Sequence, residues 1–330
     1  MQRKAAGATM SRMAEGDLTP LYAAPSGGFA RRSFLAGLFA SALAFGGARS
    51  SWAVSPRTLS TEASTSEEDR LAAIKAIPFN KLRDDVKAKL LAVVERPSIY
   101  RRLPDQLIDC NPDLFIFFIR YPEVIINIWD LMAISNVQIR RTAPYEFDVT
   151  DGAGTVSTAE LVYGTRNLHL VYAHGAYEGP VLKRKLSGRC VLLLQSDYSV
   201  SETNRPQIAN RLDAFVAIDN AGAEVVAKTL HPVMGRTADH NFAETAHFLG
   251  RLSQAAETNG EGVCKLAERL ELVEPKVRSE FQRLINHIAT NAPAANTTRR
   301  TDPETLGRPS FQYPQPEQRS PSRVAAPRQR

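Results

Sequence analysis

The chain has 330 residues, 43% of them hydrophobic, which favours a globular protein of one or two domains. The formal net charge of +6 lies in the two ends: residues 1–53 carry six Lys or Arg against two Asp or Glu, and residues 291–330 carry seven against three. Residues 54–290 therefore carry about −2, which argues against nucleic acid as a partner because no basic folded face is expected.

The N-terminus has the pattern of an export signal. Ala30-Arg31-Arg32-Ser33-Phe34-Leu35-Ala36 opens an apolar run that ends at Phe45 and is too short for a permanent membrane-spanning helix. This resembles a twin-arginine signal peptide, and Ser51-Trp52-Ala53 has the small residues that signal peptidase accepts. We predict a signal peptide over residues 1–53 and a periplasmic or cell-envelope location, with an uncleaved anchor as the alternative. The resemblance implies folding before export and identifies no cofactor.

A helical region packed on the sheet is predicted over residues 69–136. It follows a Ser- and Thr-rich segment, residues 54–68, that is predicted to be a flexible linker. The spacing of apolar residues predicts one helix over 71–77, a second capped by Asn80 and a third capped by Ser98.

The most hydrophobic stretch after the signal is DLFIFFIRYPEVIINIWDLMAI, residues 113–134. Arg120 and Pro122 divide it into halves that are too short to span a membrane. The pattern predicts two buried helices, with Pro122 in the first turn of the second. Trp129 is expected to fill a core or to line a cavity.

From residue 137 the pattern changes to short alternating runs separated by turn signals. The spacers are too short for parallel crossovers, so they predict an antiparallel meander of about six or seven strands. Helices precede the meander and a long closing helix follows it within residues 137–257, which makes the fold class α+β. The predicted strands are Val137–Arg140, Tyr145–Val149, Val156–Tyr163, Leu168–Tyr172, Cys190–Leu194, Leu212–Ile218 and Val225–Leu230.

Two further helices are predicted in residues 258–291, over 261–273 and 276–291. The second has one apolar face, which we expect to pack within the chain; a dimer contact is the alternative. Residues 292–330 are rich in Pro, Gln and Arg and are predicted to be disordered. This basic tail has anionic lipids or acidic wall polymers as candidate partners.

The order of these elements resembles the START/polyketide-cyclase-like superfamily. The similarity covers about residues 122–256: an apolar helix beginning Tyr121-Pro-Glu-Val124, a meander containing YEFDVTDGAGT, LVYG and GRCVLLL, and LDAFVAID before a long helix. It implies a curved antiparallel sheet that grips the last helix around an apolar cavity, usually for a hydrophobic small molecule or lipid. The chain departs from the pattern in its extra helices at residues 68–118 and in lacking an evident first strand.

The predicted function is therefore non-catalytic binding of a hydrophobic small molecule or lipid between the sheet and the closing helix. Strand alternation places Tyr172 and His174 on one face, where their polar tips could bond a ligand. The closing helix contributes its apolar side. The predicted ligand contacts are Tyr172, His174, Phe242, Ala246, Leu249 and Trp129.

A polar stripe on the closing helix supports an alternative. His240, Glu244 and His247 lie at positions i, i+4 and i+7, so one helix face presents two imidazoles and a carboxylate to a metal. His231 and Asp239 extend this cluster towards the start of the helix. A metalloprotein or enzyme using this cluster is one alternative function, and an envelope protein acting only through protein contacts is another. The stripe lies opposite the apolar side, so a solvated helix face with Asp239 as N-cap is the other interpretation.

The three cysteines show no CxxC spacing. Buried free thiols are expected, and a single disulfide in an oxidising compartment is the alternative. The residues concerned are Cys110, Cys190 and Cys264.

Overall fold

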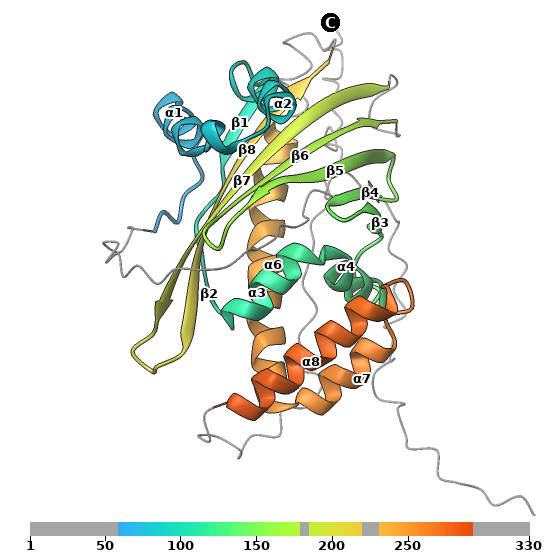
Figure 1. Ribbon diagram of the computed structural model, residues 1–330. Helices are drawn as coiled ribbons and strands as arrows, with labels where there is room; N and C mark the ends of the chain where they lie inside the picture. The colour runs from blue at the N-terminus through green and yellow to red at the C-terminus, as the bar shows by residue number, and fades with distance from the viewer. Residues whose placement is uncertain (1–58, 179–184, 220–230, 293–330) are drawn as a thin grey trace, which may run out of the picture.

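The computed structural model describes residues 59–178, 185–219 and 231–292. In these ranges an antiparallel sheet has helices on both faces, and the predicted α+β class is confirmed (Figure 1). The strands are β1 (Ile99–Arg102), β2 (Gln106–Asp109), β3 (Gln138–Ala143), β4 (Glu146–Thr150), β5 (Thr155–Gly164), β6 (Leu168–Tyr177), β7 (Leu186–Val200) and β8 (Pro206–Ile218). The helices are α1 (Glu67–Ala76), the 3-10 turn η2 (Phe79–Lys81), α2 (Asp84–Val94), α3 (Pro112–Arg120), α4 (Pro122–Leu131), α6 (His231–Thr258), α7 (Gly260–Glu268) and α8 (Pro275–Asn291).

The sheet is an open meander that its first strands extend at one edge. From β3 to β8 each strand pairs with the next, and the order across the sheet is β1-β8-β7-β6-β5-β4-β3. Both β1 and β2 pair antiparallel with β8, one after the other along its length. The predicted strand over residues 225–230 and the turn before it lie outside the described residues.

Strands β1 and β2 stand where a helix after Ser98 was predicted, so that prediction is wrong. The segment is short, and Pro104 interrupts it. Its extended backbone is stabilised by the long neighbour β8, against which Tyr100 pairs opposite Phe215. Asn80 also does not cap the next helix: it lies in η2, and α2 follows Arg83.

Residues 59–66 are bound to the sheet, which corrects the prediction of a flexible linker for this part of the chain. Ser64 and Arg102 exchange two backbone hydrogen bonds of 2.9 and 2.8 Å. The amide of Asp105 donates to the carbonyl of Ser60 at 2.8 Å, and the amide of Ser60 donates to the Asp105 carboxylate at 3.1 Å. The folded domain therefore begins before α1, which is capped by Ser66.

The two buried helices form as predicted and meet at Tyr121. The side chain of Asn111 caps α3 by accepting hydrogen bonds from the amides of Asp113 and Leu114 at 2.9 and 3.2 Å. Pro122 occupies the first position of α4, where its missing amide hydrogen costs nothing. The break therefore follows from the sequence itself.

Apolar cores fill both sides of the sheet. One core lies between the sheet and α3, α4, α6, α7 and α8, and includes Phe147, Phe248 and Phe281. The other lies between the sheet and α1 and α2, and includes Leu90 and Phe215. Helix α6 runs 28 residues across the first of these faces, longer than predicted (Figure 1).

Helix α8 packs within the chain, as predicted. Its apolar face is buried, and the ring of Phe281 stacks on that of Phe117 in α3 with centroids 5.4 Å apart. The predicted face is thus a core element and contacts α3, α6 and α7.

A buried ionic network holds α1 and β1 to β8. The carboxylate of Asp213 is fully buried and accepts hydrogen bonds from the Tyr100 hydroxyl at 2.7 Å and from Nε of Arg102 at 2.8 Å. The Arg102 guanidinium also pairs with Asp69 of α1. Burial raises the pKa of Asp213, and the hydrogen bonds from its two partners oppose that change.

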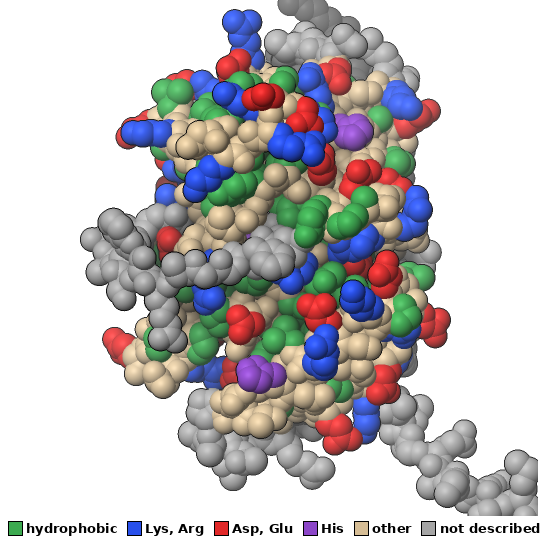
Figure 2. Space-filling model, in the orientation of Figure 1, with side chains coloured by type: hydrophobic (Ala, Val, Ile, Leu, Met, Phe, Trp, Pro, Cys, Tyr) green, Lys and Arg blue, Asp and Glu red, His purple; other side chains and the backbone are tan. Residues whose placement is uncertain are grey.

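The surface mixes charges of both signs. On the face shown in Figure 2, basic and acidic side chains alternate without a large patch of one sign. No helix in the described ranges has the length and apolarity needed to cross a membrane.

Candidate ligand-binding groove

The residues predicted to contact a ligand lie on opposite faces of the sheet. Tyr172 packs in the core beneath α1 and α2, and His174 is exposed two residues further along the same face of β6. The other four belong to the core between the sheet and α6, and each is at most 7% exposed: Trp129, Phe242, Ala246 and Leu249. One ligand between the sheet and α6 therefore cannot touch all six.

The core around these four residues is closely packed. Trp129 meets Phe248 edge to face, with ring centroids 5.9 Å apart. A hollow between β1, β8 and α6 has a volume of about 40 Å³, which is space for about one water molecule. The predicted lipid site under α6 is not formed by the side chains that were expected to line it.

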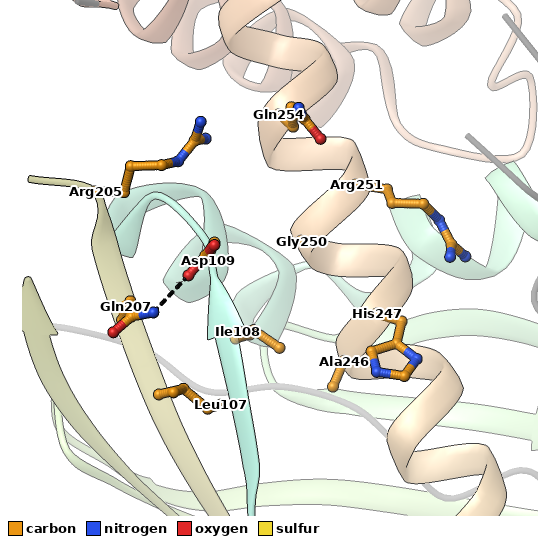
Figure 3. A pocket seen from close by; sticks show the side chains of 10 residues that line it. All are labelled: Leu107, Ile108, Asp109, Arg205, Gln207, Ala246, His247, Gly250, Arg251 and Gln254. Carbon is orange, nitrogen blue, oxygen red and sulfur yellow. Dashed lines mark hydrogen bonds between the residues drawn. The ribbon is translucent and has the colours of Figure 1, made fainter. Parts of the chain in front are cut away.

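A larger hollow opens at the edge of the sheet, where β2 and the start of β8 lie beside α6 (Figure 3). We call it the β2–α6 groove. Its volume is about 550 Å³, and it is open to the surface. It is lined by Leu107, Ile108, Asp109, Arg205, Gln207, Ala246, His247, Gly250, Arg251 and Gln254.

The groove exists because of two local features. Strand β2 pairs with β8 on one side, which leaves its other edge facing α6. Gly250 has no side chain, so the middle of α6 presents only backbone between the flanking residues Ala246 and Gln254 (Figure 3). A Cβ atom at position 250 would lie 3.5 Å from the carbonyl oxygen of Asp109, an ordinary contact. Glycine is therefore not required for packing here, although its absence of a side chain widens the groove.

The polar groups from the sheet side are paired with each other or with α6. The side-chain amide of Gln207 donates a hydrogen bond to the Asp109 carboxylate at 2.8 Å. The Arg205 guanidinium forms an ion pair with the Glu257 carboxylate of α6 at 2.8 Å. Burial raises the pKa of Glu257, and Arg205 opposes this change. These contacts fix the strand-side wall and neutralise most of its charge.

The helix side of the groove has different chemistry. His247 and Arg251 leave α6 on the same side, one turn apart (Figure 3). His247 is exposed, whereas Nε and Nη2 of Arg251 are buried and donate no hydrogen bond. Leu107, which is 47% exposed, supplies apolar surface nearby, whereas Ala246 is only 3% exposed. The groove thus presents one exposed apolar side chain, and the buried Nε and Nη2 of Arg251 are not accessible from it.

The predicted metal ligands do not converge. His240 and Glu244 are half-buried and His247 is exposed along α6. Among the described residues no three His, Cys, Asp or Glu side chains form a group that could hold a metal ion. The side chain of His231, at the first residue of α6, lies outside the described set. Helical spacing aligns the stripe, but in the part of the chain that the structure describes no second element brings the ligands needed to complete a site.

Asp239 has a structural partner. It lies inside α6, not at the N-cap, because the helix begins at His231. Nε of Arg101 in β1 donates to its carboxylate at 2.8 Å, and a second guanidinium nitrogen also contacts it. This ion pair connects α6 to the edge of the sheet. Asp239 therefore has a structural role and does not belong to the predicted metal-binding or catalytic cluster.

Other titratable side chains are buried away from the groove. His169 of β6 is 2% exposed, neither ring nitrogen has a hydrogen-bond partner, and burial lowers its pKa to about 4. All three cysteines are free, and burial raises the pKa of Cys110 and Cys190 to about 12. The buried thiols of Cys110 and Cys190 are therefore unreactive at neutral pH in the folded protein.

Sequence reasoning missed most of the groove. Ala246 and His247 were singled out, but for a core ligand and a metal, respectively. Leu107 and Asp109 were assigned to a helical region, and Arg205 fell between two predicted strands without an assignment. No local pattern marks these residues, because they meet only when β2 pairs with β8.

Comparison with known proteins adds no relative: no family model matches the chain, and no curated protein matches it.

Proposed function

We propose that the protein is an exported, non-catalytic binding protein that holds a small amphipathic molecule in the β2–α6 groove. The observation that carries this proposal is the groove itself, with its volume of about 550 Å³ between the sheet and the closing helix. Small-molecule sites typically have volumes of about 300–1,000 Å³. The lining suits an amphipathic ligand better than a purely hydrophobic one, because polar side chains flank Leu107, the exposed apolar side chain of the lining.

We also propose that the domain is of the START-like, helix-grip type. Three features support this: β1 and β2 precede the helical pair α3 and α4, β1 pairs with the last strand β8, and α6 follows β8 across the sheet. The first strand that the sequence pattern lacked is thereby supplied. Helices α1, α2, α7 and α8 are additions to that pattern.

Export is proposed from the sequence alone. Its support is the twin-arginine pattern at Arg31-Arg32 and the apolar run that follows. The predicted signal peptide and the basic tail both lie outside the described residues.

Groove occupancy can be tested with two variants of Gly250. In Gly250→Leu, the added side chain fills the groove, and its Cβ atom has room beside Asp109. Gly250→Ala adds only a methyl group, and both changes favour the helix over glycine. Isothermal titration of the full chain with 1-octanol and with octanoate should detect binding to the wild type and to Gly250→Ala. Binding to Gly250→Leu should be at least about tenfold weaker.

Urea unfolding of the three proteins serves as the control for folding. If neither probe binds the wild type, or if both probes bind Gly250→Leu as well as they bind Gly250→Ala, the groove is not the binding site.

A further inference from the structure

We infer that the β2–α6 groove selects amphiphiles with a cationic head group, and that the exposed carboxylate of Asp109 binds that head group. This inference rests on the proposed function and names the ligand class for the same groove. The accessible side chains of β2 carry it, because the buried nitrogens of Arg251 are out of reach of a molecule in the groove.

Asp109 is an acid of the groove wall that has no basic partner. Its side chain is exposed, and one carboxylate oxygen accepts a hydrogen bond from the neutral amide of Gln207 at 2.8 Å (Figure 3). Within the described ranges no basic side chain forms an ion pair with it. A carboxylate has about four acceptor positions, so it can bind a further donor while Gln207 stays in place.

The basic group nearest to this wall is already neutralised. Arg205 forms its ion pair with Glu257 at 2.8 Å. Burial is the main cause of the raised pKa of Glu257, and the negative charge of Asp109 raises it further, against the opposing effect of Arg205. Two acids thus share one guanidinium at this end of the groove, and a cation beside Asp109 reduces the repulsion between them.

Leu107 sets the apolar part of the ligand. It lies two residues before Asp109 in β2, so both side chains leave the same face of the strand, about 7 Å apart. Leu107 is 47% exposed, and Gly250 places no side chain on the opposite wall. A cationic head group at Asp109 therefore leaves an attached alkyl chain within reach of Leu107. An anionic amphiphile is disfavoured, because Asp109 repels its head group.

The test compares three probes of equal chain length, octylamine, 1-octanol and octanoate, by isothermal titration against the full chain at pH 7 and low salt. Wild-type protein should bind protonated octylamine about threefold more tightly than 1-octanol, the size expected of a solvent-exposed ion pair, and octanoate more weakly than 1-octanol. The preference for octylamine should shrink as sodium chloride is added. In Asp109→Asn, which keeps an oxygen for Gln207, the preference should disappear while binding of 1-octanol is unchanged.

The control is Glu271→Gln, which removes an exposed carboxylate between α7 and α8, outside the groove. This variant should keep the wild-type preference for octylamine; loss of the preference here would mean that net charge, and not Asp109, causes it. Equal binding of octylamine and 1-octanol by the wild type would overturn the inference of a cationic head group while leaving the groove as a binding site. Persistence of the preference in Asp109→Asn would also overturn it. Absence of binding by all three probes would refute the proposed function, and the inference with it.

Discussion

Acid is expected to destabilise this protein through His169. Both ring nitrogens of this buried imidazole lack partners, and its pKa is lowered to about 4. In the unfolded chain the pKa of histidine is about 6.5, so the unfolded state binds the proton first as the pH falls. The contribution of neutral His169 to stability is therefore present above about pH 6.5 and is lost progressively towards pH 4. A difference of about 2.5 pH units corresponds to about 3 kcal/mol.

The assay is urea unfolding of the wild type and of His169→Leu at a series of pH values between 7 and 4. Leucine has a similar size and cannot bind a proton. The difference in unfolding free energy between the two proteins should move by about 3 kcal/mol in favour of the variant as the pH falls. Acidic groups with raised pKa values, such as Asp213 and Glu257, are present in both proteins and cancel in this comparison.

His174 provides a matched control on the same strand. Its side chain is exposed, so His174→Leu measures what the same substitution does to stability when the histidine is not buried. Parallel stability profiles for the wild type and His169→Leu would refute the assignment of acid sensitivity to the buried imidazole.

Two other predictions concern buried groups. Asp213→Ala should lower the unfolding free energy by about 3–5 kcal/mol, because it removes the buried partner of Arg102 and leaves that guanidinium paired only with the partly exposed Asp69. Removing the exposed Asp85 should cost much less than removing Asp213, because its ion pair with Arg83 is screened by solvent, and similar losses in urea unfolding would contradict this reasoning. Iodoacetamide should label Cys264 in the folded protein well before Cys110 and Cys190, whose thiols are buried and have pKa values of about 12. Peptide mass mapping checks the order, and early labelling of either buried thiol would count against it.

Helices governed by local rules could be predicted well. The break between α3 and α4 follows from Pro122, and the buried face of α8 follows from apolar residues at helical spacing. Each of the strands β4 to β8 overlaps a strand predicted from alternation, although β6, β7 and β8 extend up to six residues beyond the predicted ends. In these elements the local preference and the tertiary environment agree.

Elements that depend on a distant partner could not be predicted. Strands β1 and β2 have four residues each and are extended because β8, about a hundred residues later, pairs with both. The segment at Ser60 and Ser64 has the composition of a linker, yet hydrogen bonds to Asp105 and Arg102 hold it in place. The amino-acid composition of this segment does not indicate that Asp105 and Arg102 bind it.

For the candidate site, too, the local relations could be predicted and the long-range ones could not. Sequence alone placed Tyr172 and His174 on one face of a strand, and His240, Glu244 and His247 on one face of a helix, since these relations depend only on backbone periodicity. It could not decide which face of the sheet α6 would cover.

The sequence by itself thus determined the α+β class, the closing helix and the helices around Pro122, because each follows from short-range spacing. Only the tertiary structure decided that α6 buries Phe242 and Leu249 in a filled core, and that β2 lies beside α6 to form an open groove. The physical reason is that the groove is built by residues from three separate segments, whose meeting depends on strand pairing and close packing over long distances in the chain.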